Sequence, residues 1–118
     1  MHKQLALALV VLYVITLTAF SLINLGGIPS LGSSFDDKIY HFGAYALFTL
    51  LLYNYLNAVS IKNSIFYSIL FAVSYGILME ILQNLLTETR VSDFYDVVAN
   101  FLGIIFGAIM ISIYKKLK

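Results

Sequence analysis

The sequence contains no cysteine, a single proline and few charged residues. Without cysteine, the chain has no disulfide and no thiolate metal site, and cysteine usage says nothing about its redox compartment. Charged residues make up 11% of the 118 residues, whereas about 25% is usual in soluble domains. The formal net charge of +1 lacks the basic surplus that neutralises phosphates, so we expect no nucleic-acid partner.

Apolar residues make up most of the sequence. The sequence is 61% hydrophobic, with a mean hydropathy of +0.92. A soluble domain of this length has a large surface relative to its core and needs polar side chains to cover that surface. This chain has too few of them, so the sequence predicts a protein whose outer surface faces lipid.

Four apolar runs are long enough to span a bilayer, at positions 5–23, 39–59, 64–86 and 94–114. Each comes near the ~20 residues that a helix needs to cross a ~30 Å hydrocarbon core. The runs are continuous rather than alternating, which argues against strands. The first run exceeds the 7–15 residues typical of a signal-peptide core, and no small-residue cleavage site follows it. We therefore expect one domain, 1–118, with an all-α, four-transmembrane-helix bundle and an uncleaved first helix.

The positive charges predict how this bundle is oriented. Five lysines flank one side of the membrane, namely Lys3, Lys62, Lys115, Lys116 and Lys118, whereas Lys38 and Arg90 flank the other. Lysine and arginine are enriched in cytoplasmic segments. Both termini are therefore expected in the cytoplasm.

Polar and small residues recur at helical spacing in three of the four runs. The stripes are Asp37, His41 and Tyr45 in the second run; Ala72, Gly76, Glu80 and Gln83 in the third; and Asp93, Asp96, Asn100, Gly103 and Gly107 in the fourth. Residues three or four apart share a helix face. Gly76, Gly103 and Gly107 are expected to let helices pack closely, because small residues permit close approach in membranes. We expect the three stripes to face one outward-opening polar pocket, with the first helix packed as a wall.

The expected pocket contains more acids than bases. It holds Asp37, Glu80, Asp93 and Asp96 against Lys38 and Arg90. Burying two uncompensated negative charges is prohibitive, so a proton on Glu80, a charged His41 or a bound divalent cation must balance them. Arg90 is expected to pair with Glu80 or Asp96, because its fork can hold a carboxylate with two hydrogen bonds. No metal site and no cofactor is firmly predicted.

The polar residues form three motifs in order along the chain: Asp37-Lys38-x-x-His41-Phe42, Glu80-x-x-Gln83 and Arg90-x-x-Asp93-x-x-Asp96-x-x-Ala99-Asn100-x-x-Gly103-x-x-x-Gly107. Together these motifs resemble the VanZ-like family of bacterial integral membrane proteins. The resemblance implies a multi-pass protein of the bacterial cytoplasmic membrane, and the family's namesake is associated with low-level teicoplanin resistance. It also implies ligand-binding positions at Asp37, Lys38, His41, Glu80, Gln83, Arg90, Asp93, Asp96 and Asn100.

Several functions stay open at this point. The first is an accessory protein that binds or modifies a cell-envelope component, such as a cell-wall lipid or a glycopeptide. The second is an intramembrane enzyme acting on a lipid-linked envelope substrate. There, His41, Glu80 and Asp96 are the catalytic candidates, as metal ligands or as an acid–base pair. A small transporter is less favoured, because the first helix carries no acid. The polar residues could also form a purely structural clasp between helices, and an oligomer is not excluded.

Overall fold

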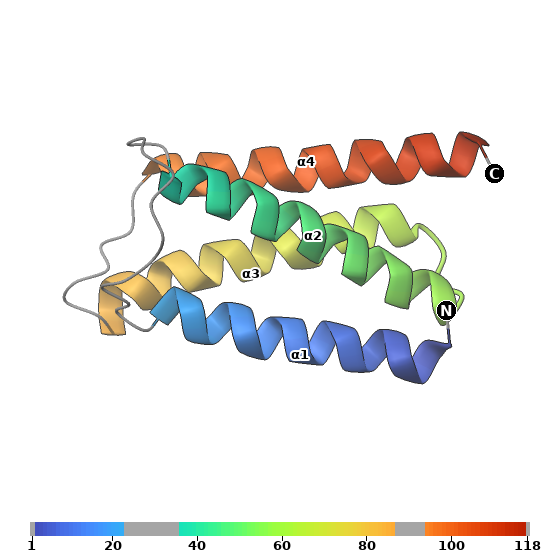
Figure 1. Cartoon of the computed structure of the whole chain (residues 1–118), viewed down its shortest axis with the longest axis horizontal. Helices are drawn as coiled ribbons and strands as arrows, with labels where there is room; N and C mark the ends of the chain where they lie inside the picture. The colour runs from blue at the N-terminus through green and yellow to red at the C-terminus, as the bar shows by residue number, and fades with distance from the viewer. Residues whose placement is uncertain (1, 23–35, 87–93, 118) are drawn as a thin grey trace.

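The computed structural model describes residues 2–22, 36–86 and 94–117, which fold into an all-α bundle (Figure 1). Its four helices are α1 Lys3–Leu22, α2 Asp36–Ala58, α3 Ser64–Leu86 and α4 Phe94–Leu117. No strand occurs in these ranges. The predicted fold class is confirmed.

The helices differ from the apolar runs mainly at their polar ends. The bounds of α3 are those predicted, whereas α1 begins two residues earlier than expected and α2 three residues earlier. Helix α4 continues for three more residues, through Lys115 and Lys116. Hydropathy measures only the span that can lie in lipid. Backbone hydrogen bonding continues a helix beyond that span, and lysines in its last turn interact favourably with the helix dipole.

Three helices, α1, α3 and α4, are long and apolar enough to cross a membrane. Many of their large apolar side chains point outward; Leu12 and Ile15 are each 61% exposed and Phe66 is 60% exposed. Such a surface is stable against acyl chains and costly in water. The chain is therefore a membrane protein. Helix α2 has 23 residues, as many as α3, but is less apolar, and its crossing stays a prediction.

Helix α2 lies at the centre of the bundle and contacts all three others, most extensively α4. The start of α1, the turn between α2 and α3 and the end of α4 lie at one end of the molecule (Figure 1). The starts of α2 and α4 lie side by side at the opposite end. This arrangement gives the bundle two distinct ends, which are called here the terminal end and the far end.

Two glycines of α4 bring its backbone against that of α2. A Cβ at Gly103 would stand 2.2 Å from the carbonyl oxygen of Phe42, and one at Gly107 would stand 2.9 Å from that of Ala46. Because these neighbours are backbone atoms, a side chain could fit only if a helix moved. The structure thus places Gly103 and Gly107, two of the three predicted packing glycines, in the α2–α4 contact.

The turn between α2 and α3 has Schellman geometry without a glycine. The N–H of Ser60 donates to the carbonyl of Asn57 (3.1 Å), and the N–H of Ile61 donates to that of Leu56 (3.0 Å). Ser60 adopts a left-handed φ of 62° and Asn63 one of 58°. These bonds satisfy carbonyls at the end of α2, and they reverse the chain so that α3 runs back along α2.

Aromatic packing and hydrogen bonds fix α1 and α3 against α2. The ring of Phe48 lies 5.6 Å from that of Tyr13 and 5.2 Å from that of Tyr75, centroid to centroid. Hydrogen bonds also join α1 to its neighbours along its length. The Tyr13 hydroxyl donates to the Ala44 carbonyl, the hydroxyls of Thr18 and Tyr75 bond each other (2.6 Å), and Gln83 Nε2 donates to the Ser21 carbonyl (2.8 Å). Helix α1 is thus packed against the bundle, as predicted, and is also held by hydrogen bonds to α2 and α3.

Candidate functional site

An ion pair joins the starts of α2 and α4 at the far end. Lys38 is the third residue of α2, and Asp96 is the third residue of α4. Lys38 Nζ lies 3.1 Å from Asp96 Oδ1. The Lys38 side chain is 25% exposed and that of Asp96 only 6%. The carboxylate is therefore held inside the bundle and the ammonium nearer its surface.

His41 stands one turn further along α2 and contacts two residues of α4. Its Nδ1 lies 2.8 Å from Asn100 Oδ1, and its Nε2 lies 3.6 Å from Asp96 Oδ2. Asp96 and Asn100 are four residues apart, so they share one face of α4. The four side chains of Lys38, His41, Asp96 and Asn100 form what is called here the polar cluster.

The two ring nitrogens of His41 have different roles. Because the Asn100 oxygen accepts a hydrogen bond, Nδ1 carries the proton in this arrangement. At 3.6 Å, Nε2 makes no direct hydrogen bond with Asp96. A lone pair on Nε2 facing a carboxylate is unfavourable unless a proton or a bridging polar group lies between them. The 3.6 Å between His41 Nε2 and Asp96 Oδ2 is therefore a distance that a polar group bonded to both atoms can bridge.

Asn100 lies where three helices meet. It is 1% exposed, and its Oδ1 contacts His41 of α2. Its Nδ2 faces α3, where a Cβ at Gly76 would stand 3.5 Å from that nitrogen and 3.2 Å from Tyr45 Cε2. The absence of a side chain at Gly76 thus lets α3 approach both polar residues.

The two predicted site residues of α3 have different surroundings. Glu80 is buried, with 7% exposure, and shares a helix face with Gly76, where a Cβ would stand 3.2 Å from Tyr45 Cε2 of α2. Gln83 is 3% exposed, and its amide nitrogen donates to the Ser21 carbonyl of α1. Glu80 therefore faces the same layer of α2 as the polar cluster, while the Gln83 amide nitrogen anchors α1.

Arg90, Asp93 and the side chain of Asp37 lie outside the described residues. The predicted pairing of Arg90 with an acid is therefore untested, whereas Asp96 is paired with Lys38 and His41. Among the described side chains, Lys38 and His41 both lie beside Asp96, and Glu80 is a second buried acid of the bundle. No group of three or more acids and histidines placed to hold a metal ion is found within this part of the chain.

Comparison with known proteins gives one match. The family model described as VanZ/LLP1 matches residues 5–115, and so includes α1 as well as the motifs between 37 and 107. No curated protein matches the chain, and no solved structure does. The matched range contains all four residues of the polar cluster.

Proposed function

The chain belongs to the VanZ/LLP1 family, and from this premise we propose that it is an accessory membrane protein whose polar cluster binds the head group of a cell-envelope component. One observation carries the proposal. His41 is held between Asp96 and Asn100 at the far end of the bundle. A buried histidine in contact with a carboxylate and a carboxamide is suited to recognising a polar ligand.

The energetic cost of the cluster favours binding over a purely structural clasp. An interhelical hydrogen bond in a membrane contributes on average about 0.6 kcal/mol. Placing one Asp at the centre of a transmembrane helix costs about 2.5–3.5 kcal/mol, and less near its ends. Glu80 and Asp96 are both buried. Two such acids are a costly way to gain a few weak bonds, which supports a role in binding.

Exposure and charge define the class of ligand. Side-chain exposure falls from 25% at Lys38 through 14% at His41 to 6% at Asp96, so the cluster is approached from the Lys38 side. Asp96 already compensates the charge of Lys38, which disfavours a bare phosphate. A hydroxyl group can donate to the carboxylate and accept from the Lys38 ammonium or the imidazole. In a zwitterionic head group, the ammonium can donate to the carboxylate while the phosphate accepts, and the group adds no net charge. We therefore propose a glycosyl or zwitterionic head group.

Orientation places the cluster on the outer side of the membrane in this proposal. The terminal end of the bundle carries Lys3, Lys62, Lys115 and Lys116. Cytoplasmic segments are enriched in lysine, so this end is assigned to the cytoplasm and both termini with it. The far end then opens to the outer face of the bacterial cytoplasmic membrane, where envelope lipids and glycopeptides are accessible.

An intramembrane enzyme is the second candidate, and the His41–Asp96 pair favours it. Asn100 fixes the ring through Nδ1 and leaves Nε2 without a direct hydrogen bond. A base oriented through one nitrogen and open at the other can transfer a proton. The substrate would be a lipid-linked envelope molecule, whose polar end reaches the far end of the bundle.

Teicoplanin susceptibility of a bacterium expressing the protein tests the proposal. Wild type is expected to raise the inhibitory concentration, and Asp96→Asn to abolish the increase while accumulating normally in the membrane. Thr18→Val is the matched control, because it removes an interhelical bond outside the cluster. Loss of the effect in both variants, or failure of Asp96→Asn to accumulate, would favour the clasp. A chemically altered envelope lipid that depends on Asp96 would favour the enzyme.

A further inference from the structure

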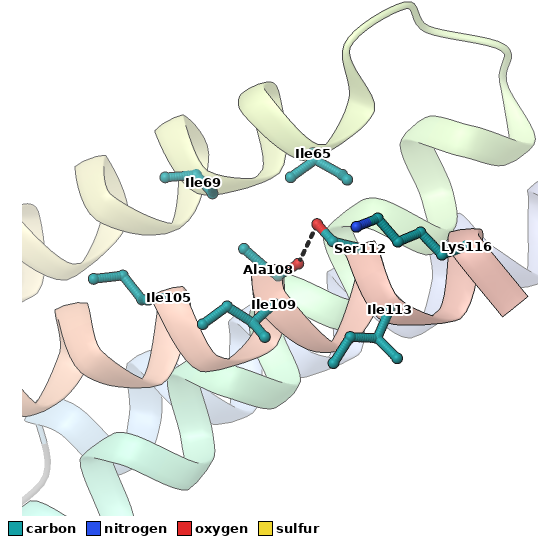
Figure 2. A pocket seen from close by; sticks show the side chains of 8 residues that line it. All are labelled: Ile65, Ile69, Ile105, Ala108, Ile109, Ser112, Ile113 and Lys116. Atoms are coloured by element: carbon teal, nitrogen blue, oxygen red, sulfur yellow. Dashed lines mark hydrogen bonds between the residues drawn. The ribbon is translucent and has the colours of Figure 1, made fainter.

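A second site lies between α3 and α4 near the terminal end, away from the polar cluster (Figure 2). It is an open groove of about 510 Å³, within the range of ligand-binding pockets. Its apolar wall consists of Ile65 and Ile69 from α3 and of Ile105, Ala108, Ile109 and Ile113 from α4. A groove of this composition at a lipid-facing surface accepts an alkyl chain.

One end of the groove is charged. Lys116 is the only charged residue among those that line it, and Figure 2 shows its side chain running back along α4 toward Ser112. The Ser112 hydroxyl donates to the Ala108 carbonyl (3.0 Å) and so is already used within its own helix. Lys116 is therefore the group that can bind an external anion at this end.

From this arrangement we propose that the α3–α4 groove holds one acyl chain of an anionic phospholipid, whose phosphate pairs with Lys116. The apolar wall matches the chain and the ammonium matches the head group. Basic sites between transmembrane helices on the cytoplasmic side bind anionic lipids in this way. The site is independent of the polar cluster and of the function proposed for it.

Charge favours a lipid over a second copy of this chain. The terminal end of the bundle bears Lys62, Lys115 and Lys116. A second copy inserted in the same orientation would bring an equal set of lysines beside these. Like charges in close contact repel, whereas a lipid phosphate brings the opposite charge to the same place.

Tryptophan fluorescence can test the site, because the chain has no tryptophan of its own. Ile113→Trp places a probe in the groove. Leu7→Trp is the matched control: Leu7 lies four residues from the start of α1, and Ile113 four residues from the end of α4. The two side chains are also similarly exposed, at 44% and 53%. Each variant is reconstituted with brominated phosphatidylglycerol or brominated phosphatidylcholine as the quencher.

At Ile113→Trp, brominated phosphatidylglycerol is expected to bind in the groove with about fivefold higher affinity than brominated phosphatidylcholine. One lysine near an anionic lipid provides a preference of this size. Leu7→Trp also has a lysine one turn away, Lys3, but does not line the groove, so its preference for phosphatidylglycerol should be clearly smaller. Equal quenching at both positions would overturn the proposal. Protection of Ile113→Trp from both lipids, increasing with protein density, would assign the groove to a second copy and overturn it as well.

Native mass spectrometry gives an independent test, because it needs no tryptophan in the apolar wall of the groove. After addition of phosphatidylglycerol, the wild-type protein should retain one lipid molecule, and Lys116→Gln should reduce its occupancy about fivefold. Lys115→Gln removes the same charge from the neighbouring position, which does not line the groove, and should retain the lipid. Equal retention by the two variants would show that Lys116 does not bind the phosphate.

Discussion

Gly103 of α4 lies against the carbonyl group of Phe42 on α2, so closely that a Cβ at Gly103 would stand 2.2 Å from the carbonyl oxygen. Phe42 follows His41 directly in α2, and Gly103 lies three residues after Asn100 in α4. The backbone contact therefore sits beside the hydrogen bond that joins His41 to Asn100. Close helix approach and the geometry of the polar cluster depend on the same glycine.

Gly103→Ala is expected to destabilise the bundle by about 1–3 kcal/mol, the usual cost of overpacking. Gly43→Ala is the control, because nothing lies within 4 Å of a Cβ there. That variant should be neutral or more stable by about 0.5–1 kcal/mol, since alanine is the better helix former. Unfolding in mixed micelles measures both. Equal stability of the two variants would contradict the α2–α4 contact described.

A double-mutant cycle of His41→Ala and Asn100→Ala should give a coupling energy of about 0.6 kcal/mol, as measured for interhelical hydrogen bonds in membranes. Each single variant should also lose binding of the head group. Zero coupling energy would show that the bond between His41 and Asn100 does not form.

Thr18→Val and Tyr75→Phe form the matching cycle outside the polar cluster, because their hydroxyls are 2.6 Å apart. A similar coupling energy is expected, with binding of the head group unchanged. If these variants lost binding as fully as His41→Ala and Asn100→Ala, the loss would come from stability alone.

Ser60→Gly should stabilise the turn between α2 and α3 by about 0.5–1 kcal/mol. A residue with a Cβ is disfavoured in the left-handed region, where glycine is not, and Ser60 has a φ of 62°. Asn63→Gly should gain less, since asparagine tolerates its φ of 58° better. Thermal unfolding followed by circular dichroism compares the two. A loss of stability in Ser60→Gly would contradict the turn geometry.

The sequence was sufficient to predict the fold class and the helices. Lys38, His41, Asp96 and Asn100 were among the nine predicted ligand-binding positions, but nothing in the sequence separated these four from the other five. Apolar run length predicted α3 to the residue, and the spacing of Asp96 and Asn100 predicted that they share a face. Helical spacing also related Tyr45 to His41, and the structure shows the two rings stacked at 6.5 Å.

The pairing of side chains could not be read from spacing. The expected pairing of Arg90 with an acid stays a prediction, because Arg90 lies outside the described residues. The pairing of Asp96 with Lys38 was missed, because spacing along one helix cannot relate Lys38 to α4. The bond from Gln83 to the Ser21 carbonyl was also missed, because its acceptor is a backbone atom that no side-chain pattern marks. Such contacts depend on how two helices are rotated about their axes, which hydropathy does not determine.

The most direct test of the polar cluster as a binding site is ¹⁵N NMR of His41 in lipid nanodiscs. His2→Gln leaves His41 as the only histidine. Adding glucosyl diacylglycerol or phosphatidylethanolamine is expected to shift the Nε2 resonance, leave Nδ1 bound to Asn100, and have no effect in Asp96→Asn. An Nε2 resonance unchanged by either lipid in a folded protein would contradict the account.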